Sequence, residues 1–367
     1  MTLRVFEAFA GVGSQRMALR NLGIDHEVVA IAEIDKFAIK SYEAIHGETN
    51  NLGNISQIKT EDIPDHDLFT YSFPCQDISV AGKGLGLDEG SGTRSGLLWE
   101  CQKVIAVKKP KYLLLENVKN LVSKKHKHNF DLWLEWLEKQ GYTNYWQVLN
   151  AKDYGIPQNR ERVFVVSILG EHEPYVFPEK QELTLRLKDV LEDEVDEKFY
   201  LDDEKTNKLV YRFSLKDEPF LLGGEQKNQA IKKDGISTTL TSSMGTGGGH
   251  LPMINCIHGI PIKNGTKKGY LEAVEGDGID LAYPNSTARR GRVQRDTVQT
   301  LDTSNSKGVV DNLRIRKLTP KECWRLMGFS DDDFHKAEQV NSNTQLYKQA
   351  GNSIVVDVLE AIFKELF

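Results

Sequence analysis

The sequence predicts an α/β protein: a doubly wound, mostly parallel sheet with a smaller, irregular, β-rich domain inserted into it. Two observations predict this class. Apolar, strand-like runs alternate with amphipathic helical patterns up to Leu169, and the alternation stops between Glu171 and Leu313. Repeated strand–helix units are typical of a parallel sheet covered by helices. We therefore expect a first domain over residues 1–183, an inserted domain over 184–313, and a return segment, 314–367, that completes the first domain.

The elements of the first domain follow from the apolar periodicity. Six runs, several nearly continuous in apolar residues, are expected to be strands: Leu3–Ala10, Glu27–Ala32, Asp67–Ser72, Tyr112–Leu115, Tyr145–Asn150 and Arg162–Leu169. Four amphipathic patterns predict helices over Ser14–Leu22, Lys36–His46, Gly96–Val107 and Phe130–Lys139. A last apolar pattern at helical spacing predicts a C-terminal helix that packs back on the first domain; it comprises Ile354, Val355, Val358, Leu359, Ile362 and Phe363.

Composition narrows the class of protein. No apolar run approaches the roughly 20 residues that span a bilayer, and the N-terminus has no secretory signal pattern, so we expect a cytoplasmic protein with no membrane partner. The four cysteines form no CxxC pair, so we predict neither disulfide bonds nor a metal. The net charge is −6, yet Ser286–Arg325 has ten basic and four acidic residues. That segment is equally compatible with a solvated face and with a surface that binds phosphates.

Four predicted strands end in residues that could form a site, because ligands of open α/β sheets bind beyond the carboxyl ends of the strands. The first strand ends in the turn FAGVGS, where Gly11 and Gly13 would let a cofactor approach the backbone. The second ends at Glu33, at a suitable distance to bond ribose hydroxyls. The third runs into Cys75 and the fourth into Glu116. In isolation the turn could be only a tight turn, Cys75 a packing residue and Glu116 a surface carboxylate; their common edge favours a site.

A further cluster precedes the last predicted strand. Gln158, Arg160 and Arg162 alternate in QNRER, and a period of two puts all three on one face of a strand. They could hold a carboxylate and a phosphate, or form the solvent face of an edge strand.

Taken in order, these segments resemble the C5-specific DNA cytosine methyltransferases of bacteria and phages, which use S-adenosylmethionine. FAGVGS is similar to the cofactor turn of that family, FPCQ to its nucleophile motif, ENV to its glutamate motif and QNRER to its Gln-x-Arg-x-Arg motif. GTRSGLLWE resembles the stretch after the family's catalytic loop, and RKLTPKECWRLMGF and QAGNSIVV resemble its last two motifs. Each motif is weak alone, but together they cover about residues 3–170 and 313–364 in the order of the family.

The resemblance implies a Rossmann-like methyltransferase fold, a catalytic and cofactor-binding domain at 1–183 and a target-recognition domain at 184–313. It implies S-adenosyl-L-methionine as the cofactor and double-stranded DNA as the partner of a monomer. A cognate restriction enzyme acting on the same site is one biological setting; phage self-protection and regulation are the others. The glycines of Ala81–Gly92 would suit a mobile lid.

Roles for individual residues also follow from the resemblance. The catalytic residues would be Cys75, Glu116, Arg160 and Arg162: Cys75 attacks carbon 6 of a flipped-out cytosine, and Arg160 orients Glu116. The cofactor would contact Phe9, Gly11, Gly13, Glu33, Ile34, Asn54, Ile55, Pro74, Asn352 and Ser353. DNA would contact Gln76, Ser79, Arg94, Arg289, Arg290, Arg292, Arg295, Thr300 and Leu301, with Thr239-Leu240 as the alternative to the last pair.

Three residues depart from the usual pattern of that family. Ser72 stands where glycine is usual, and Ile34 replaces the aromatic residue that commonly follows the ribose glutamate. Asn54 replaces an aspartate, so we expect Asn54 or the backbone of Ile55 to meet the adenine amino group. Rival functions are a tRNA-methylating enzyme with the same core, an inactive DNA-binding or cofactor-sensing module, and a nicotinamide oxidoreductase, which explains the glycine turn alone.

Overall fold

The computed structural model describes residues 2–74, 97–200, 221–222, 253–254, 260–303, 306–311 and 314–367. The chain divides into two compact units. Unit 1 comprises Met1–Asp193, Gln299–Asn305 and Leu318–Phe367, and unit 2 comprises Glu194–Val298 and Ser306–Lys317. Residues 184–193 and 299–305, which we expected in the inserted domain, therefore belong to unit 1. The limits of a target-recognition domain in the functional sense stay a prediction.

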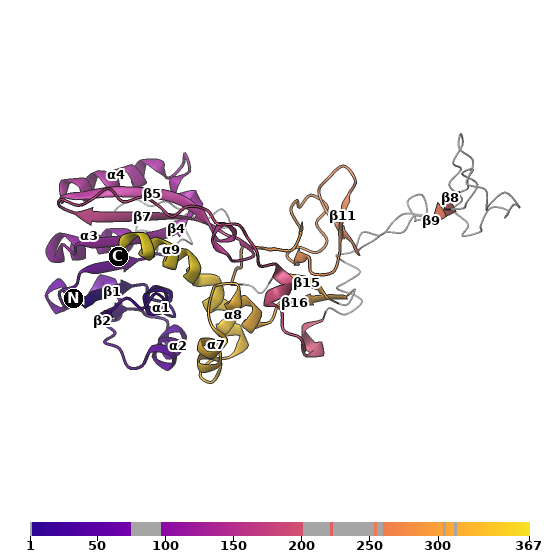
Figure 1. Cartoon of the computed structure of the whole chain (residues 1–367), viewed down its shortest axis with the longest axis horizontal. Helices are drawn as coiled ribbons and strands as arrows, with labels where there is room; N and C mark the ends of the chain where they lie inside the picture. Colours follow the sequence, from indigo (N-terminus) through magenta and orange to yellow (C-terminus); the bar gives the residue numbers. More distant parts are fainter. Residues whose placement is uncertain are drawn as a thin grey trace, which may run out of the picture. The chain divides into compact units, whose positions relative to one another are not determined.

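Unit 1 contains a six-stranded sheet with the order β2-β1-β3-β4-β7-β5 (Figure 1). Neighbours among the first four strands in this order are parallel, and β7 is antiparallel to both β4 and β5. The expected doubly wound, mostly parallel sheet is thus confirmed. The strands are β1 (Leu3–Ala8), β2 (His26–Ala32), β3 (Leu68–Tyr71), β4 (Tyr112–Val118), β5 (Tyr142–Asn150) and β7 (Glu161–Leu169). The two-residue β6 (Gln158–Asn159) precedes β7.

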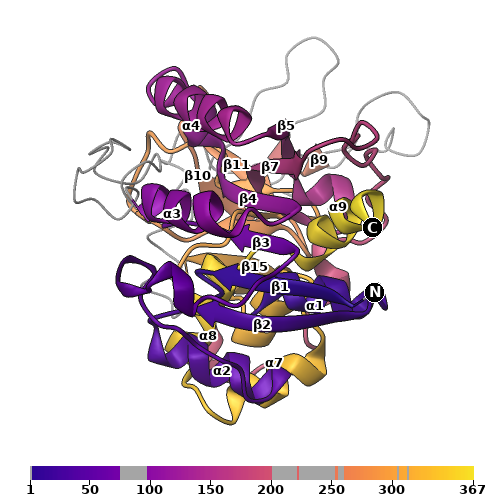
Figure 2. The ribbon, with the colours of Figure 1, turned by 90° about the vertical axis from the view of Figure 1, so that its left-hand side faces the viewer.

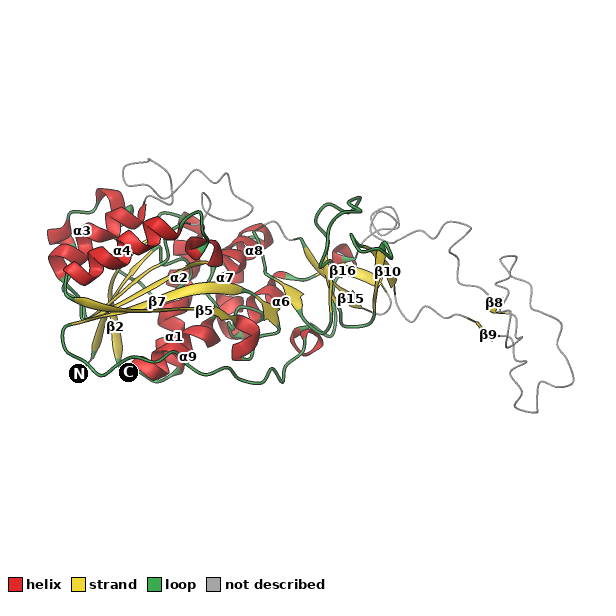
Figure 3. Ribbon diagram, turned by 90° about the horizontal axis from the view of Figure 1, so that it is seen from above, coloured by secondary structure: helices red, strands yellow, loops and turns green. Residues whose placement is uncertain are grey.

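Helices cover both faces of this sheet. Figure 2 shows α3 (Leu98–Lys108) and α4 (Lys127–Lys139) on one face and α1 (Ser14–Asn21) and α9 (Val356–Leu366) on the other, and Figure 3 shows the same layers from above. α9 packs against α1, as the C-terminal apolar pattern predicted, and its buried side chains include Val358, Leu359, Ile362 and Phe363. The remaining helices are α2 (Lys36–His46), α6 (Pro320–Arg325), α7 (Asp331–Glu338) and α8 (Asn343–Asn352).

The core of unit 1 is aromatic where β1 and β3 meet. The rings of Phe6 and Phe69 stack at 5.2 Å and those of Phe69 and Tyr71 at 5.0 Å. All three side chains are fully buried, and such offset aromatic pairs add stability beyond the area that they bury. Cys101 and Cys323 are buried, as is typical of cysteines that serve as small packing residues.

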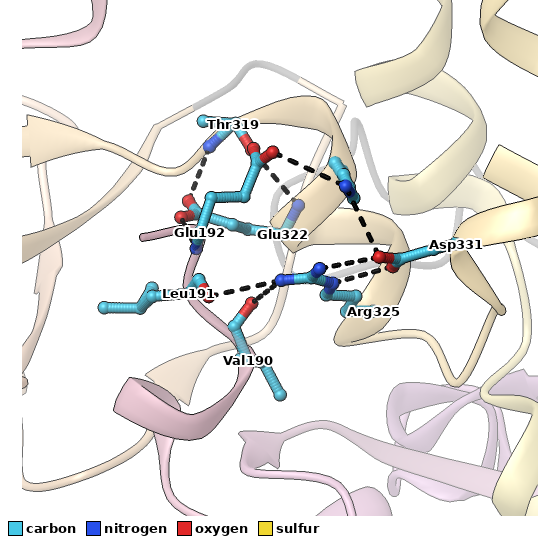
Figure 4. A network of polar contacts seen from close by, with 8 residues as sticks. Val190, Leu191, Glu192, Thr319, Glu322, Arg325 and Asp331 are labelled. Atoms are coloured by element: carbon cyan, nitrogen blue, oxygen red, sulfur yellow. Dashed lines mark hydrogen bonds and ion pairs between the residues drawn. The ribbon is translucent and has the colours of Figure 1, made fainter. Parts of the chain in front are cut away.

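A polar network joins the return segment to the chain just before it leaves unit 1 (Figure 4). α6 begins with a capping box in which the Thr319 hydroxyl accepts the N–H of Glu322 and the Glu322 carboxylate accepts the N–H of Thr319. Glu322 also accepts the N–H of Glu192 at 2.9 Å, and the hydroxyl of Thr319 donates to the Glu192 carboxylate.

Arg325 strengthens the same junction. Its guanidinium forms a bidentate pair with Asp331 at 2.7 Å and donates to the carbonyl oxygens of Val190 and Leu191 at 3.1 and 3.2 Å. A bidentate arginine–carboxylate pair fixes geometry as well as adding energy. Residues 190–192 are therefore held firmly at the exit toward unit 2.

Unit 2 is β-rich. Its larger sheet has the order β13-β12-β15-β16, and β10 and β11 form an antiparallel hairpin. Ile262, Ala273, Ile279 and Val310 form its small apolar core. The strands are β10 (Ile260–Lys263), β11 (Tyr270–Ala273), β12 (Gly278–Asp280), β13 (Val293–Gln294), β15 (Lys307–Asp311) and β16 (Arg314–Lys317), together with the two-residue strands β8 (Leu221–Leu222) and β9 (Met253–Ile254). The two-residue β14 (Val298–Gln299) lies where the chain returns to unit 1 and pairs with β6. None of the described helices is long and apolar enough to cross a membrane.

Candidate active site and target-binding surface

The turn between β1 and α1 has the backbone that its glycines predicted. Phe9, Gly11 and Gly13 have φ values of 58°, 58° and 83°. Glycine adopts this left-handed region freely, whereas Phe9 is strained there. A Cβ added to Gly11 would meet nothing within 4 Å, so the backbone at Gly11 is open to a ligand. A Cβ on Gly13 would lie 2.5 Å from Nε2 of His46, so only glycine fits there.

Glu33 lies beside this turn at the end of β2. Its Oε2 accepts the N–H of Gly11 at 2.9 Å, and its Oε1 accepts the N–H groups of Ile34 and Asp35 at 2.8 Å each. The next side chain, Ile34, is 72% exposed. The carboxylate is therefore fixed at the glycine turn, next to an exposed apolar surface.

Asn51 is a residue that sequence reasoning missed. Its Oδ1 accepts the N–H groups of Glu33 and Gly53, and its Nδ2 donates to the carbonyl oxygen of Glu33 at 3.1 Å. It joins the end of β2 to the segment that carries Asn54, whose own Oδ1 accepts the N–H of Ser56. Ile55 is buried. Nothing in the local pattern around Asn51 marks it, because its partner lies 18 residues away.

A buried polar cluster lies directly beneath the turn, and the sequence did not reveal it either. Glu7 of β1 is fully buried, and the Tyr42 hydroxyl donates to its Oε2 at 2.8 Å. Burial raises the pKa of Glu7 to about 7, against the opposing effects of Tyr42 and Arg16. Burial also lowers the pKa of His46 to about 3, and its Nε2 lies 3.1 Å from the carbonyl oxygen of Val12 within the turn.

Glu116 lies in β4 at the same edge of the sheet and is 8% exposed. The Nε of Arg162 lies 3.1 Å from its Oε1, and Ser72 lies beside Glu116 in the continuation of the ladder between β3 and β4. Burial raises the pKa of Glu116 more than the charges of Arg162 and Arg160 and the Ser72 hydrogen bond lower it. A carboxyl group whose ionised form is disfavoured by burial holds its proton more readily than an exposed one, which favours a role as a proton donor.

Gln158 and Arg160 fasten segments that are distant in sequence. Gln158 donates to the carbonyl oxygen of Leu326 at 2.7 Å and accepts the N–H of Leu301 at 3.0 Å. Arg160 donates to the carbonyl oxygens of Leu301, Gly351 and Ser353. The Thr300 hydroxyl donates to the carbonyl oxygen of Asn159, so the Thr-Leu pair lies beside this motif.

In unit 2 the basic segment divides into buried and exposed arginines. Arg292 is fully buried and donates to the carbonyl oxygens of Asp280, Ala282, Tyr283 and Ser286 at 2.9–3.4 Å. Arg290 is exposed, and its Nε donates to the carbonyl oxygen of Gly265.

The two other arginines of this segment form ion pairs. Arg289 pairs with the carboxylate of Asp280, and its guanidinium lies 5.4 Å from the ring centre of Tyr283, which is 74% exposed. Arg295 pairs with Asp277.

Comparison with known proteins identifies the family. The model of the C-5 cytosine-specific DNA methylases matches residues 3–367. The chain belongs to this family. It is 41% identical to the type II methyltransferase M2.ScrFI of Lactococcus lactis subsp. cremoris, across 100% of this chain and 99% of that relative. It is 35% identical to the orphan methyltransferase M.SPBetaI of Bacillus phage SPbeta, across 99% and 97%.

Solved structures share the fold of this methylase. The Entamoeba histolytica methyltransferase EhMeth matches with a TM-score of 0.63 and 18% identity, across 100% of this chain and 98% of that one. The enzyme is accordingly a DNA (cytosine-5-)-methyltransferase with a Rossmann-like methyltransferase fold and a β-rich second unit. Its family methylates cytosine in DNA with S-adenosylmethionine.

The glycine turn of the methylase fits the adenosyl cofactor of its family. The open space at Gly11 leaves backbone accessible, and the Glu33 carboxylate lies against that residue. Exposed Ile34 supplies an apolar surface of the kind that packs on an adenine ring.

Two expectations for the methylase need correction. Arg292 cannot read DNA from its place in unit 2, because it is buried and its guanidinium is engaged by four carbonyl groups. Gln158, Arg160 and Arg162 do not share one strand face, because β6 ends at Asn159 and β7 begins at Glu161. Arg162 is the arginine that pairs with Glu116, whereas the hydrogen bonds from Arg160 support the segments around Leu301 and Ser353.

Several predicted site residues of the methylase lie outside the described residues: Cys75, Gln76, Ser79, Arg94, the segment 81–92 and the pair Thr239-Leu240. Pro74 is the last described residue before them, and β3 ends three residues earlier at Tyr71.

Proposed function

We propose that this protein methylates carbon 5 of a cytosine that is flipped out of a specific duplex DNA sequence, through a covalent bond between Cys75 and carbon 6. The observation that supports the proposal most is the pair of buried Glu116 with partly exposed Arg162, at the sheet edge where β3 leads into Cys75. Glu116 then takes the role of the group that contacts ring nitrogen 3 and the exocyclic amine.

The chain's own residues account for the proposed steps. The Cys75 thiolate adds to carbon 6, and the electron pair of the 5,6 double bond makes carbon 5 nucleophilic. Negative charge that spreads into the ring is met by Glu116, which donates or shares a proton at nitrogen 3; such help is worth roughly 10²–10⁴-fold in rate. Bound S-adenosylmethionine would supply the methyl group that carbon 5 accepts; the bond from its sulfonium sulfur to that methyl group would break, and S-adenosylhomocysteine would leave. Loss of the carbon-5 proton to a base re-forms the double bond and expels the Cys75 thiolate.

For the cofactor we propose contacts at the glycine turn and at the neighbouring strand ends. Gly11 and Gly13 shape the turn, Glu33 faces the ribose and Ile34 packs on the adenine. The other proposed contacts are Phe9, Asn54, Ile55, Pro74, Asn352 and Ser353. Because the side-chain oxygen of Asn54 caps Ser56, we favour the backbone of Ile55 as the acceptor for the adenine amino group.

For DNA we propose that Arg289, Arg290 and Arg295 contact phosphates or base edges, together with Gln76, Ser79, Arg94, Thr300 and Leu301. Exposed Arg290 is the strongest candidate for a DNA contact among the three arginines, since Arg289 and Arg295 already pair with aspartates. Arg292 instead supports the loop that carries Tyr283. We further propose that the enzyme acts as a cytoplasmic monomer, with or without a restriction enzyme for the same site.

The test exposes plasmid DNA to the purified protein and S-adenosylmethionine and maps methylated cytosines by bisulfite sequencing. We expect one short recognition sequence to be methylated. Duplex with 5-fluorocytosine at the target should become covalently attached to Cys75, and Cys75→Ser should bind DNA without turnover. Activity on tRNA alone would refute the DNA assignment, and trapping by Cys75→Ala would refute the nucleophile.

A further inference from the structure

Ser72 occupies a position beside Glu116 that the strand register determines. In the parallel pair of β3 and β4, Thr70 lies opposite Leu114 and Tyr71 opposite Leu115. Ser72 directly follows Tyr71, so continuation of the ladder brings it next to Glu116. Asn117 holds this alignment beyond the end of β3, because its Nδ2 donates to the carbonyl oxygen of Phe73 at 2.9 Å.

Two side chains that can donate hydrogen bonds flank Glu116, one from each neighbouring side of β4. On one side β7 pairs antiparallel with β4, and Arg162 of β7 places its Nε 3.1 Å from Oε1. On the other side lies Ser72, the residue that directly follows β3, and a hydrogen bond from its side chain is among the causes that lower the pKa of Glu116. Arg160 is the other charged group whose field acts on Glu116.

We propose that Ser72 is a positioning residue for Glu116: its hydroxyl fixes the carboxyl group from the side opposite the Arg162 strand. This inference rests on the proposed role of Glu116 in methyl transfer. A glutamate side chain has three rotatable bonds, and one ion pair leaves the carboxyl plane able to turn. A second donor on a neighbouring strand fixes that plane, and with it the direction in which Glu116 meets the cytosine ring.

The hydroxyl also acts on the protonation of Glu116. Hydrogen bonds to a carboxylate favour its ionised form. Removing the Ser72 hydroxyl therefore leaves burial opposed only by the two arginines, and Glu116 holds its proton to higher pH. Where the protonated form assists the reaction, the fall in rate on the alkaline side must move to higher pH.

The test compares Ser72→Ala and Ser72→Thr with the wild type in single-turnover methyl transfer to duplex DNA across a range of pH. We expect Ser72→Ala to lower the rate by about tenfold, the order of one hydrogen bond to a charged group, and to shift the alkaline limb upward. KM for DNA should stay within about twofold, since Glu116 acts mainly on the reacting ring. Ser72→Thr retains the hydroxyl and should restore both the rate and the pH profile.

Thr70→Val is the matched control. It removes a buried hydroxyl from the same strand, and within the described residues that hydroxyl has no hydrogen-bond partner. A Ser72→Ala profile that coincides with that of the wild type, or a Thr70→Val profile that shifts like that of Ser72→Ala, would overturn the inference. Ser72→Gly provides a second variant without the hydroxyl and should repeat the Ser72→Ala result. A wild type that methylates no DNA would instead refute the proposed function.

Discussion

Glu7 makes the stability of unit 1 depend on pH. Its side chain is fully buried in β1, and burial raises its pKa from 4.5 to about 7. The folded state therefore binds the proton more tightly than the unfolded state, so the stabilising contribution is complete below about pH 4.5 and is lost as pH rises through about 7. A difference of about 2.5 pKa units corresponds to about 3 kcal/mol. Glu7→Gln cannot ionise and should remove this loss.

The measurement is urea unfolding of the wild type and Glu7→Gln at pH 5 and pH 8. All five tryptophans lie in segments of unit 1, so their fluorescence reports the unit that contains Glu7. The amide carries its own cost of burial, but that cost is the same at both pH values. We expect the free energy of unfolding of the variant minus that of the wild type to be about 2–3 kcal/mol larger at pH 8 than at pH 5, so that the variant gains relative stability at high pH.

Glu27→Gln is the control for this comparison, because Glu27 is an exposed residue of the neighbouring strand β2. Its substitution should change stability equally at the two pH values. If Glu7→Gln also shows no difference between pH 5 and pH 8, then Glu7 does not hold a proton in the folded state, and the argument from its burial is wrong.

Two further predictions concern the cofactor turn and the DNA-binding unit. Gly13→Ala should lower affinity for S-adenosylmethionine by tenfold or more in calorimetry and destabilise unit 1 by about 1–3 kcal/mol, because the added Cβ would lie 2.5 Å from His46. Gly11→Ala, with open space around its Cβ, should destabilise unit 1 less. Equal losses of stability in the two variants would contradict this reasoning. Arg292→Ala should destabilise unit 2 by about 3 kcal/mol or more, which would be seen as faster proteolysis. Arg290→Ala should leave proteolysis unchanged, weaken DNA binding and reduce by about one the slope of the logarithm of the binding constant against the logarithm of the salt concentration. Unchanged proteolysis of Arg292→Ala would show that its four carbonyl contacts do not support the unit.

The sheet and its flanking helices could be predicted from the sequence because their signal is local. Continuous apolar runs and helical periods are visible within about ten residues, and Lys36–His46 was predicted at the limits observed. Strand ends were less certain: β4 continues through Glu116 to Val118, three residues beyond the predicted end at Leu115. There the pairing with β7 extends the strand past its apolar run.

The partners of the polar side chains required the tertiary structure. The resemblance of QNRER to the family motif implied a role for Arg160 at Glu116, but its hydrogen bond to Ser353 spans 193 residues of sequence and no local pattern reveals it. Arginine is a residue type expected at a DNA contact, and only the folded loop around Arg292 shows that this one is buried.

By itself the sequence determined the fold class, the family and the residue types at the sheet edge, since these depend on periodicity and on short motifs. Only the tertiary structure decided which side chains meet. The parallel pairing of β3 with β4 brings Ser72 beside Glu116, and the antiparallel pairing of β4 with β7 brings Arg162 to it. Side-chain contacts of this kind depend on the alignment of distant segments, and a single substitution such as serine for glycine acquires meaning only there.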